Sequence, residues 1–150
     1  MMDPASGPKL IPAEASAGIL VTDDQKFLMQ RRDNKPEIFF PGWLGCFGGA
    51  LEHGEDAMAG LMRELDEELS FKPTDPKHFC SMVLDFTFAG HGMIPRHFFV
   101  VKVTPSDLPN LQLQEGQAIE TIDAREVWKT AQIIPYDATA LWQYLSQDRF

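Results

Sequence analysis

Cysteine is scarce in this chain, and long apolar stretches are absent. The two cysteines, Cys46 and Cys80, have no second Cys or His at metal-ligand spacing. No apolar run approaches the ~20 residues that a membrane span requires. Residues 1–12 lack the basic segment and apolar run of a signal peptide. These absences predict a cytoplasmic protein with two buried, reduced thiols and no membrane partner.

Basic residues are also few. Lys and Arg total 13 against 22 Asp and Glu, which gives a formal net charge of -9. A surface this acidic repels a phosphate backbone, so we expect no nucleic-acid partner. The charge suits a protein that binds cations, or anions that already carry a cation, but it equally serves solubility. Charge alone does not separate these two explanations.

The composition is that of an ordinary globular protein, with 44% hydrophobic and 23% charged residues. A chain of 150 residues is typical of one domain, and such a domain buries roughly 70% of the surface of its unfolded form. We therefore expect a single domain over residues 1–150, whose fold needs neither a metal nor a disulfide. Residues 1–12, rich in Pro and Ala, are expected to form a loose arm.

Apolar periodicity and turn residues predict a mixture of strands and helices. We expect antiparallel hairpins from strands 17–22 and 27–32 and from strands 79–88 and 97–103, and short strands at 46–47 and 118–122. The expected helices are 55–69, 123–130 and 137–146, the last two opened by an Asp N-cap. Segments 33–45 and 104–117 should be loops. This order indicates an α/β layered domain.

The predicted helix 55–69 carries an acidic face beside its apolar face. At roughly 100° per residue, Glu64, Glu67 and Glu68 share one arc of about 100°. Carboxylates at this spacing repel each other, and a divalent cation relieves the repulsion. Their hard oxygen atoms suit Mg²⁺ or Mn²⁺. Any one of the three alone would be a solvated surface acid, but together they predict a metal site.

Residues around this face support the same prediction. Gly48 and Gly49 precede the helix, and glycines permit close backbone approach to a metal or phosphate. Arg63 lies next to Glu64 in sequence and one helical turn from Glu67, where it would orient a carboxylate. Glu55 is expected in the first helical turn, where it would favour the helix dipole.

The segment from Gly48 to Phe71, GGALEHGEDAMAGLMRELDEELSF, resembles the Nudix box. The match consists of Gly49, Glu55, Arg63-Glu64-Leu65, Glu67-Glu68 and Phe71 at the family's spacing. One fixed position departs from the pattern: Ser70 stands where the family has the Gly that ends the helix in a left-handed conformation. The departure concerns local geometry at the helix end and none of the charged positions.

This resemblance implies a fold, a metal site and an activity. The fold is a mixed, partly antiparallel sheet sandwiched between helices, with the box as a loop-helix-loop. Glu64, Glu67 and Glu68 would bind Mg²⁺ or Mn²⁺ together with the Gly48 carbonyl, while Glu55 and Arg63 would brace the loop and helix. The implied enzyme is a metal-dependent pyrophosphohydrolase that cleaves a nucleoside diphosphate linked to another group, by attack of water on phosphorus.

Two points of this function stay open from the sequence. The substrate is a nucleoside triphosphate or a nucleotide sugar. The base that removes the proton from water is Glu64 or Glu115, which belongs to a Glu115-Gly116-Gln117 tripeptide similar to one in mutator-type members. The expected catalytic residues are therefore Arg63, Glu64, Glu67 and Glu115. An alternative is a catalytically silent nucleotide-binding module, which would be expected to lose box carboxylates that this chain retains.

Residues outside the box are weaker candidates for substrate contacts. Arg31 and Arg32 end a strand, where only one can point inward, and Arg31 is favoured as the phosphate ligand. Trp43 is a candidate for stacking on a base, and Asp137 for reading a base edge or capping a helix. Gly49 and Glu55 complete the expected substrate-binding residues. The N-terminal hairpin is the candidate surface for a homodimer.

Overall fold

The computed structural model describes residues 10–147, so most of the expected loose arm lies outside the described residues. The long helices are α1 (Ala57–Leu69) and α2 (Pro135–Ser146), and three short 3₁₀ turns are η2 (Thr87–Ala89), η3 (Leu108–Asn110) and η4 (Ala124–Lys129). The strands are β1 (Ala15–Thr22), β2 (Lys26–Arg31), β3 (Leu44–Gly45), β4 (Phe47–Ala50), β5 (Lys77–Asp85), β6 (Met93–Val103) and β7 (Ala118–Asp123).

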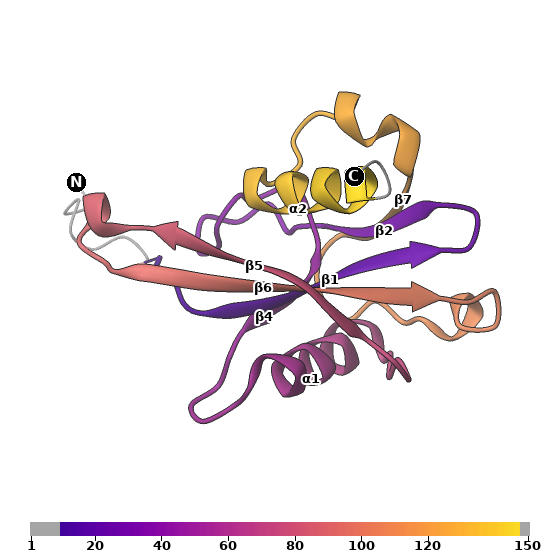
Figure 1. Ribbon diagram of the computed structural model, residues 1–150, viewed down its shortest axis with the longest axis horizontal. Helices are drawn as coiled ribbons and strands as arrows, with labels where there is room; N and C mark the ends of the chain where they lie inside the picture. Colours follow the sequence, from indigo (N-terminus) through magenta and orange to yellow (C-terminus); the bar gives the residue numbers. More distant parts are fainter. Residues whose placement is uncertain (1–9, 148–150) are drawn as a thin grey trace.

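All seven strands belong to one mixed sheet, in the order β3-β2-β1-β6-β5, with β4 paired to β1 and β7 paired to β2. The β1–β2 and β5–β6 pairs are antiparallel, as the two predicted hairpins require. β1 runs parallel to β6. Figure 1 shows α1 on one face of the sheet and α2 on the other. The predicted fold, a mixed sheet between helices, is confirmed.

The core is divided by the sheet into two clusters, because alternate residues of a strand face opposite sides. Ile19 and Phe98 belong to the cluster on the α2 side, which includes Leu141. Leu20 and Phe99 belong to the other cluster, with Leu61 and Leu65 of α1. β1 is buried along its whole length, so it forms the centre of the molecule and fixes both helices relative to the sheet.

Several predicted boundaries were wrong. The expected loop 33–45 contains β3, and β5 and β6 begin before residues 79 and 97. Two further boundaries have a local cause. The helix expected at 55–69 begins at Ala57, because the Asp56 carboxylate accepts the amide of Ala59 as the N-cap. Glu55 therefore precedes the helix and does not act on its dipole. The strand expected at 79–88 ends at Asp85, whose carboxylate accepts the backbone N–H and the hydroxyl of Thr87 and thereby turns the chain.

The N-cap prediction for Asp137 was also wrong. α2 begins at Pro135, which suits the first position of a helix because it lacks an N–H, and Asp137 lies in its first turn, fully buried. The predicted helix 123–130 is the 3₁₀ segment η4, although Asp123 does cap it. Of the two free cysteines, Cys46 is buried and Cys80 is only half-buried. In the described range, no helix is long and apolar enough to cross a membrane.

Candidate active site

The carboxylates of α1 meet the backbone of β4, which lies beside it. Glu68 is only 2% exposed, and its two oxygens accept hydrogen bonds from the Gly48 amide (2.9 Å) and from the Gln30 side-chain amide (2.9 Å). Gly48 has a φ of 150°, and a Cβ at this position would lie 2.1 Å from the carbonyl oxygen of Ser16. Only glycine fits here, and its close approach to β1 brings its amide to Glu68.

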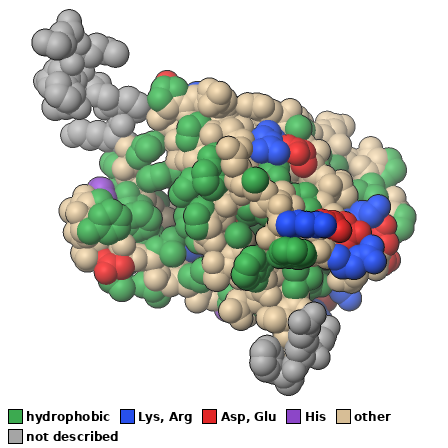
Figure 2. Space-filling view, turned by 90° about the horizontal axis from the view of Figure 1, so that it is seen from above, with side chains coloured by type: hydrophobic (Ala, Val, Ile, Leu, Met, Phe, Trp, Pro, Cys, Tyr) green, Lys and Arg blue, Asp and Glu red, His purple; other side chains and the backbone are tan. Residues whose placement is uncertain are grey.

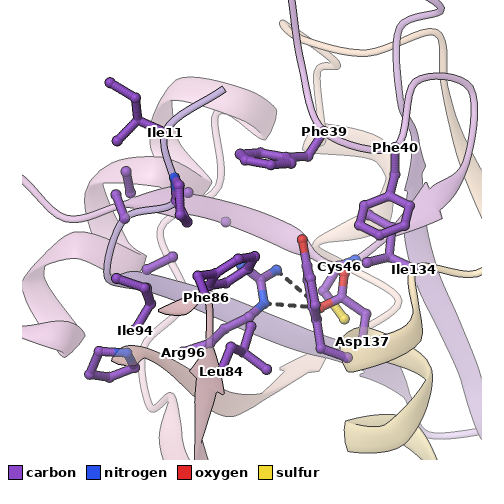
Figure 3. Close-up of a pocket in the computed structure, with 18 of the residues that line it drawn as sticks. Ile11, Phe39, Phe40, Cys46, Leu84, Phe86, Ile94, Arg96, Ile134 and Asp137 are labelled. Atoms are coloured by element: carbon purple, nitrogen blue, oxygen red, sulfur yellow. Dashed lines mark hydrogen bonds and ion pairs between the residues drawn. The ribbon is translucent and has the colours of Figure 1, made fainter. Parts of the chain in front are cut away.

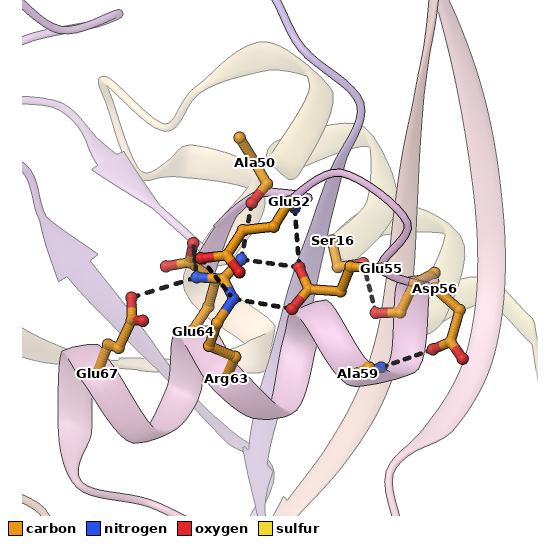
Figure 4. A network of polar contacts seen from close by, with 10 residues as sticks. Ser16, Ala50, Glu52, Glu55, Asp56, Ala59, Arg63, Glu64 and Glu67 are labelled. Atoms are coloured by element: carbon orange, nitrogen blue, oxygen red, sulfur yellow. Dashed lines mark hydrogen bonds and ion pairs between the residues drawn. The ribbon is translucent and has the colours of Figure 1, made fainter.

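Arg63 joins the loop before α1 to the helix (Figure 4). Its Nε and Nη2 donate to the two oxygens of Glu55, at 2.8 and 2.9 Å, and Nη2 also donates to the carbonyl of Ala50. Its Nη1 donates to Glu64 (3.0 Å) and Glu67 (3.2 Å). The hydrogen bonds from Arg63 lower the pKa of Glu55 to about 2. One guanidinium therefore fixes the loop and orients two of the box carboxylates.

Negative charge is in excess at this site. Burial, reinforced by the charges of Glu64 and Glu115, raises the pKa of Glu68 to about 8. Burial also raises the pKa of Glu64, against the lowering effect of Arg63. The repulsion among these carboxylates, with Arg63 as their main cationic neighbour, is the electrostatic condition that a bound divalent cation relieves.

The donor set fits a hard divalent cation. Glu64, Glu67 and Glu68 supply carboxylate oxygens, and Gly48, whose amide contacts Glu68, would add a backbone carbonyl. Across residues 10–147, no three acidic, His or Cys side chains are arranged around a common point. The reason is that Glu64 and Glu67 are engaged by Arg63, and Glu68 by Gly48 and Gln30. Side-chain rotation would have to accompany binding of a cation.

Glu115 approaches the box from the loop before β7. Its backbone carbonyl accepts a hydrogen bond from Gln30 (3.2 Å), and its charge acts on Glu64 and Glu68. It lines a polar cavity of about 520 Å³ together with Arg32 and Lys35. The structure thus brings together the box and Glu115, which are far apart in sequence.

A larger cavity of about 610 Å³ adjoins the box (Figure 3). Its wall includes Gly48 and Gly49 of the box, the side chains Phe39 and Phe40 from the loop before β3, and Phe86 from the β5–β6 hairpin. Arg32 lines both this cavity and the polar one, so the two cavities meet beside it. A ligand with one polar, charged end and one apolar end fits this arrangement.

The two arginines at the end of β2 lie in different surroundings. Arg31 is held by Glu120 in an ion pair and donates to the carbonyl of Gly42 (3.1 Å). Arg32 donates from Nε to the carbonyl of Phe39 (2.8 Å) and faces the cavities. The favoured candidate Arg31 is thus the one whose guanidinium is already paired.

The aromatic residue expected to stack on a base does not line the larger cavity. Trp43 packs against Phe40, with ring centroids 5.3 Å apart, while Phe39 and Phe40 form the wall. Phe47 is fully buried in the core. Gly49 lies at the cavity edge, where a Cβ would stand 2.6 Å from the Glu64 carboxylate.

Asp137 contributes to the cavity from α2 with both carboxylate oxygens engaged. One accepts the Cys46 amide (3.0 Å) and the other accepts Arg96 (3.0 Å). Arg96 and Gln30 are site residues that the sequence analysis missed. Strand alternation places Arg96 on the face of Phe98 and Gln30 on the face of Leu28, but alternation predicts an apolar residue at such positions.

Comparison with known proteins identifies the family. A model of the NUDIX domain matches residues 12–145. The MutT protein of Methanosarcina mazei superposes with a TM-score of 0.74 at 14% identity, covering 95% of this chain and 100% of that chain. A MutT NUDIX hydrolase from Burkholderia pseudomallei superposes with a TM-score of 0.71 at 17% identity, covering 89% of this chain and 98% of that chain.

The NUDIX domain of Shewanella oneidensis NrtR, solved with ADP ribose, has a TM-score of 0.70 at 18% identity, covering 97% of this chain and 93% of that chain. NrtR complexed with a 27mer DNA is also similar, and there this chain covers 62% of the other. Curated protein sequences give no match. Because the domain match spans nearly the whole chain, this protein belongs to the NUDIX domain family.

Proposed function

We propose that this protein is a divalent-metal-dependent pyrophosphohydrolase that cleaves a nucleoside diphosphate linked to another group. The observation that carries the proposal is the set of acidic side chains on α1, in excess of their cationic neighbours, next to Gly48 and Gly49, which line a cavity large enough for a nucleoside. A family member that had lost catalysis would not need to keep these repelling carboxylates, because they destabilise the helix that carries them.

Mg²⁺ or Mn²⁺ is the proposed cofactor, held by Glu64, Glu67, Glu68 and the carbonyl of Gly48. When bound, such an ion would lower the pKa of the water attached to it and would neutralise charge on the phosphates. The residues around it prepare the site. Arg63 orients Glu64 and Glu67, and Gln30 positions Glu68.

Glu115 is the proposed general base. Its carboxylate makes no hydrogen bond to any residue between 10 and 147, and it lines the polar cavity beside the box. Glu64, the other candidate, accepts a hydrogen bond from Arg63 at 3.0 Å and is a proposed metal ligand, so its carboxylate oxygens are already engaged. A positioned base contributes about 10²–10⁴-fold to such a reaction.

The substrate is proposed to lie across both cavities. Its phosphates would occupy the polar cavity, where Arg32 and Lys35 offset their charge, and the linked nucleoside would occupy the larger, apolar one. Arg32 therefore replaces Arg31 as our candidate for the phosphate contact. A small nucleotide rather than nucleic acid is proposed as the partner, despite the DNA-bound NrtR structure.

The surface supports a small-molecule partner. Seen from the α2 side, basic side chains lie next to acidic ones and form no broad basic patch on that face (Figure 2). The net charge of -9 also opposes binding of a nucleic-acid phosphate backbone, because like charges repel. A cytoplasmic location and a homodimer remain predictions, the second to be tested by measuring the mass in solution.

The test of the proposed function is hydrolysis of a panel of nucleoside triphosphates, nucleotide sugars and dinucleotides, with and without Mg²⁺. We expect turnover of some substrates that requires the metal, and a loss of about 10²–10⁴-fold in kcat for Glu68→Gln and Glu115→Gln. Glu126→Gln is the matched control, since Glu126 is an exposed residue of η4 that pairs with Lys129. Nucleotide binding without turnover would support the silent binding module instead.

A further inference from the structure

The larger cavity contains a buried ion pair that hydrolysis of a phosphoanhydride does not require. The side chains of Arg96 and Asp137 are 14% and 0% exposed, and Nε and Nη2 of Arg96 both donate to one oxygen of Asp137, at 3.2 and 3.0 Å. The guanidinium also lies over the rings of Tyr136 and Phe98, 4.6 and 5.4 Å from their centroids. Arg96 is therefore held in one place by contacts on several sides.

One edge of this guanidinium makes no hydrogen bond within the described residues. Nη1 of Arg96 has no hydrogen-bond partner in residues 10–147. Every buried side-chain nitrogen and oxygen in that part of the chain has a partner. Nη1 is consequently accessible, and Arg96 belongs to the cavity wall (Figure 3). The cavity thus presents rigidly placed N–H donors to its occupant.

Charge balance indicates which acceptor would receive these donors. Asp137 already neutralises Arg96, and the nearby wall is apolar, with Leu84, Phe86 and Ile94. A second anion would lie close to the Asp137 carboxylate, so a neutral oxygen acceptor is favoured over a phosphate or carboxylate. An amino group would leave the N–H donors of Arg96 unpaired in a desolvated site, at a cost.

We propose that Arg96 is a specificity-determining residue that selects nucleotides whose base presents a carbonyl, and rejects those that present an amino group in its place. This inference rests on the proposed function. Arginine side chains donate hydrogen bonds to the keto oxygen of guanine in protein–DNA complexes. Phe39, Phe40 and Phe86 supply aromatic surfaces for the faces of the base, and Arg96 reads its edge.

Two pairs of substrates test this proposal, because their members differ in a keto or amino group at one ring position. They are inosine triphosphate against ATP, and UTP against CTP. We expect kcat/KM to favour the keto member of each pair by about tenfold or more. Arg96→Gln should reduce this ratio to near one, mainly by slowing the keto substrates.

The Arg96→Lys variant is a control for loss of the fold in Arg96→Gln. Lysine keeps a positive charge for Asp137 but lacks the second donor edge, so this variant should keep the fold and still lose the preference. Arg125→Gln is the control, because Arg125 is exposed and pairs with Asp123 at the end of β7. Its keto-to-amino ratio should equal that of the wild type. Circular dichroism and melting curves establish that each variant is folded.

A binding measurement separates failure of this inference from failure of the proposed function. Calorimetric titration of the wild type and Arg96→Lys with inosine and adenosine, without metal, reports on the cavity alone. Tighter binding of inosine that Arg96→Lys abolishes supports the inference even if no nucleotide is hydrolysed. The inference is overturned if the wild type shows the same kcat/KM and the same affinity for keto and amino compounds. It is also overturned if the preference for the keto compound persists in folded Arg96 variants.

Discussion

Gly48 and Gly49 are neighbours in sequence, but each is required by a different part of the structure. A Cβ at Gly48 would lie 2.1 Å from the backbone oxygen of Ser16, whereas a Cβ at Gly49 would meet the Glu64 side chain at 2.6 Å. Backbone in a paired strand cannot move aside easily, but a side chain can rotate. The two glycines should therefore respond differently to the same substitution.

We expect Gly48→Ala to destabilise the fold by about 2 kcal/mol or more, because β4 must separate from β1. Gly49→Ala should fold with a small loss of stability and lower kcat strongly, because Glu64 is displaced from the box. Urea unfolding and steady-state kinetics on both variants provide the measurements. A normal kcat for Gly49→Ala would show that the observed position of Glu64 is not needed for turnover.

Glu68 gives a pH dependence whose sign follows from its burial. Its pKa is raised to about 8 in the folded protein, above the ordinary value of 4.5. Between these values the folded state binds more protons than the unfolded state, so its contribution to stability is present at low pH and is lost as pH rises through about 8. We expect the Tm of the metal-free wild type to fall relative to that of Glu68→Gln between about pH 5 and pH 8. A constant Tm difference across this range would contradict the assigned burial of the charge.

At the scale of elements, the end of α1 carries local strain. Ser70 has φ 53° and ψ 39°, a left-handed conformation, and its amide donates to the carbonyl of Asp66 at 2.9 Å. The family has Gly at this position, and the structure shows that Ser adopts the same conformation at a conformational cost. The helix therefore ends at the expected residue in spite of the substitution.

Ser70→Gly should stabilise the protein by about 0.5–1 kcal/mol, since Gly occupies the left-handed region without a Cβ clash. Gln143→Gly is the opposite control: Gln143 is an exposed residue inside α2, so glycine there should destabilise by a similar amount. Denaturant unfolding of both variants decides the matter. A loss of stability in Ser70→Gly would mean that the Ser side chain makes a contribution larger than the strain.

For the whole molecule, stability and metal binding should be linked. A cation that binds only the folded state raises Tm, and it competes with protons for the box carboxylates. We expect millimolar Mg²⁺ to raise Tm more at about pH 8 than at about pH 5.5, and to have little effect on a Glu64→Gln, Glu68→Gln double variant. Differential scanning calorimetry with Na⁺ at matched ionic strength provides the control. An equal rise in Tm for the double variant would place the ion elsewhere.

The sequence by itself determined the local features of this protein. The spacing of Leu61, Leu65 and Leu69 predicted a helix packed on one face, and the apolar runs rich in β-forming residues at 17–22 and 97–103 predicted paired strands. Both depend on interactions within a few residues, or on the period of the backbone. The box acids followed from the same logic, because Glu64, Glu67 and Glu68 lie within two turns of one helix.

Only the tertiary structure decided which distant residues share the site. Arg96 and Asp137 come from β6 and α2, and their pairing depends on how α2 packs across the sheet. Neither Arg32 nor Phe39 could be distinguished from its neighbour until the loop before β3 was placed. Such contacts are chosen by packing of whole elements, and a single sequence carries no local trace of them because the partners are far apart along the chain.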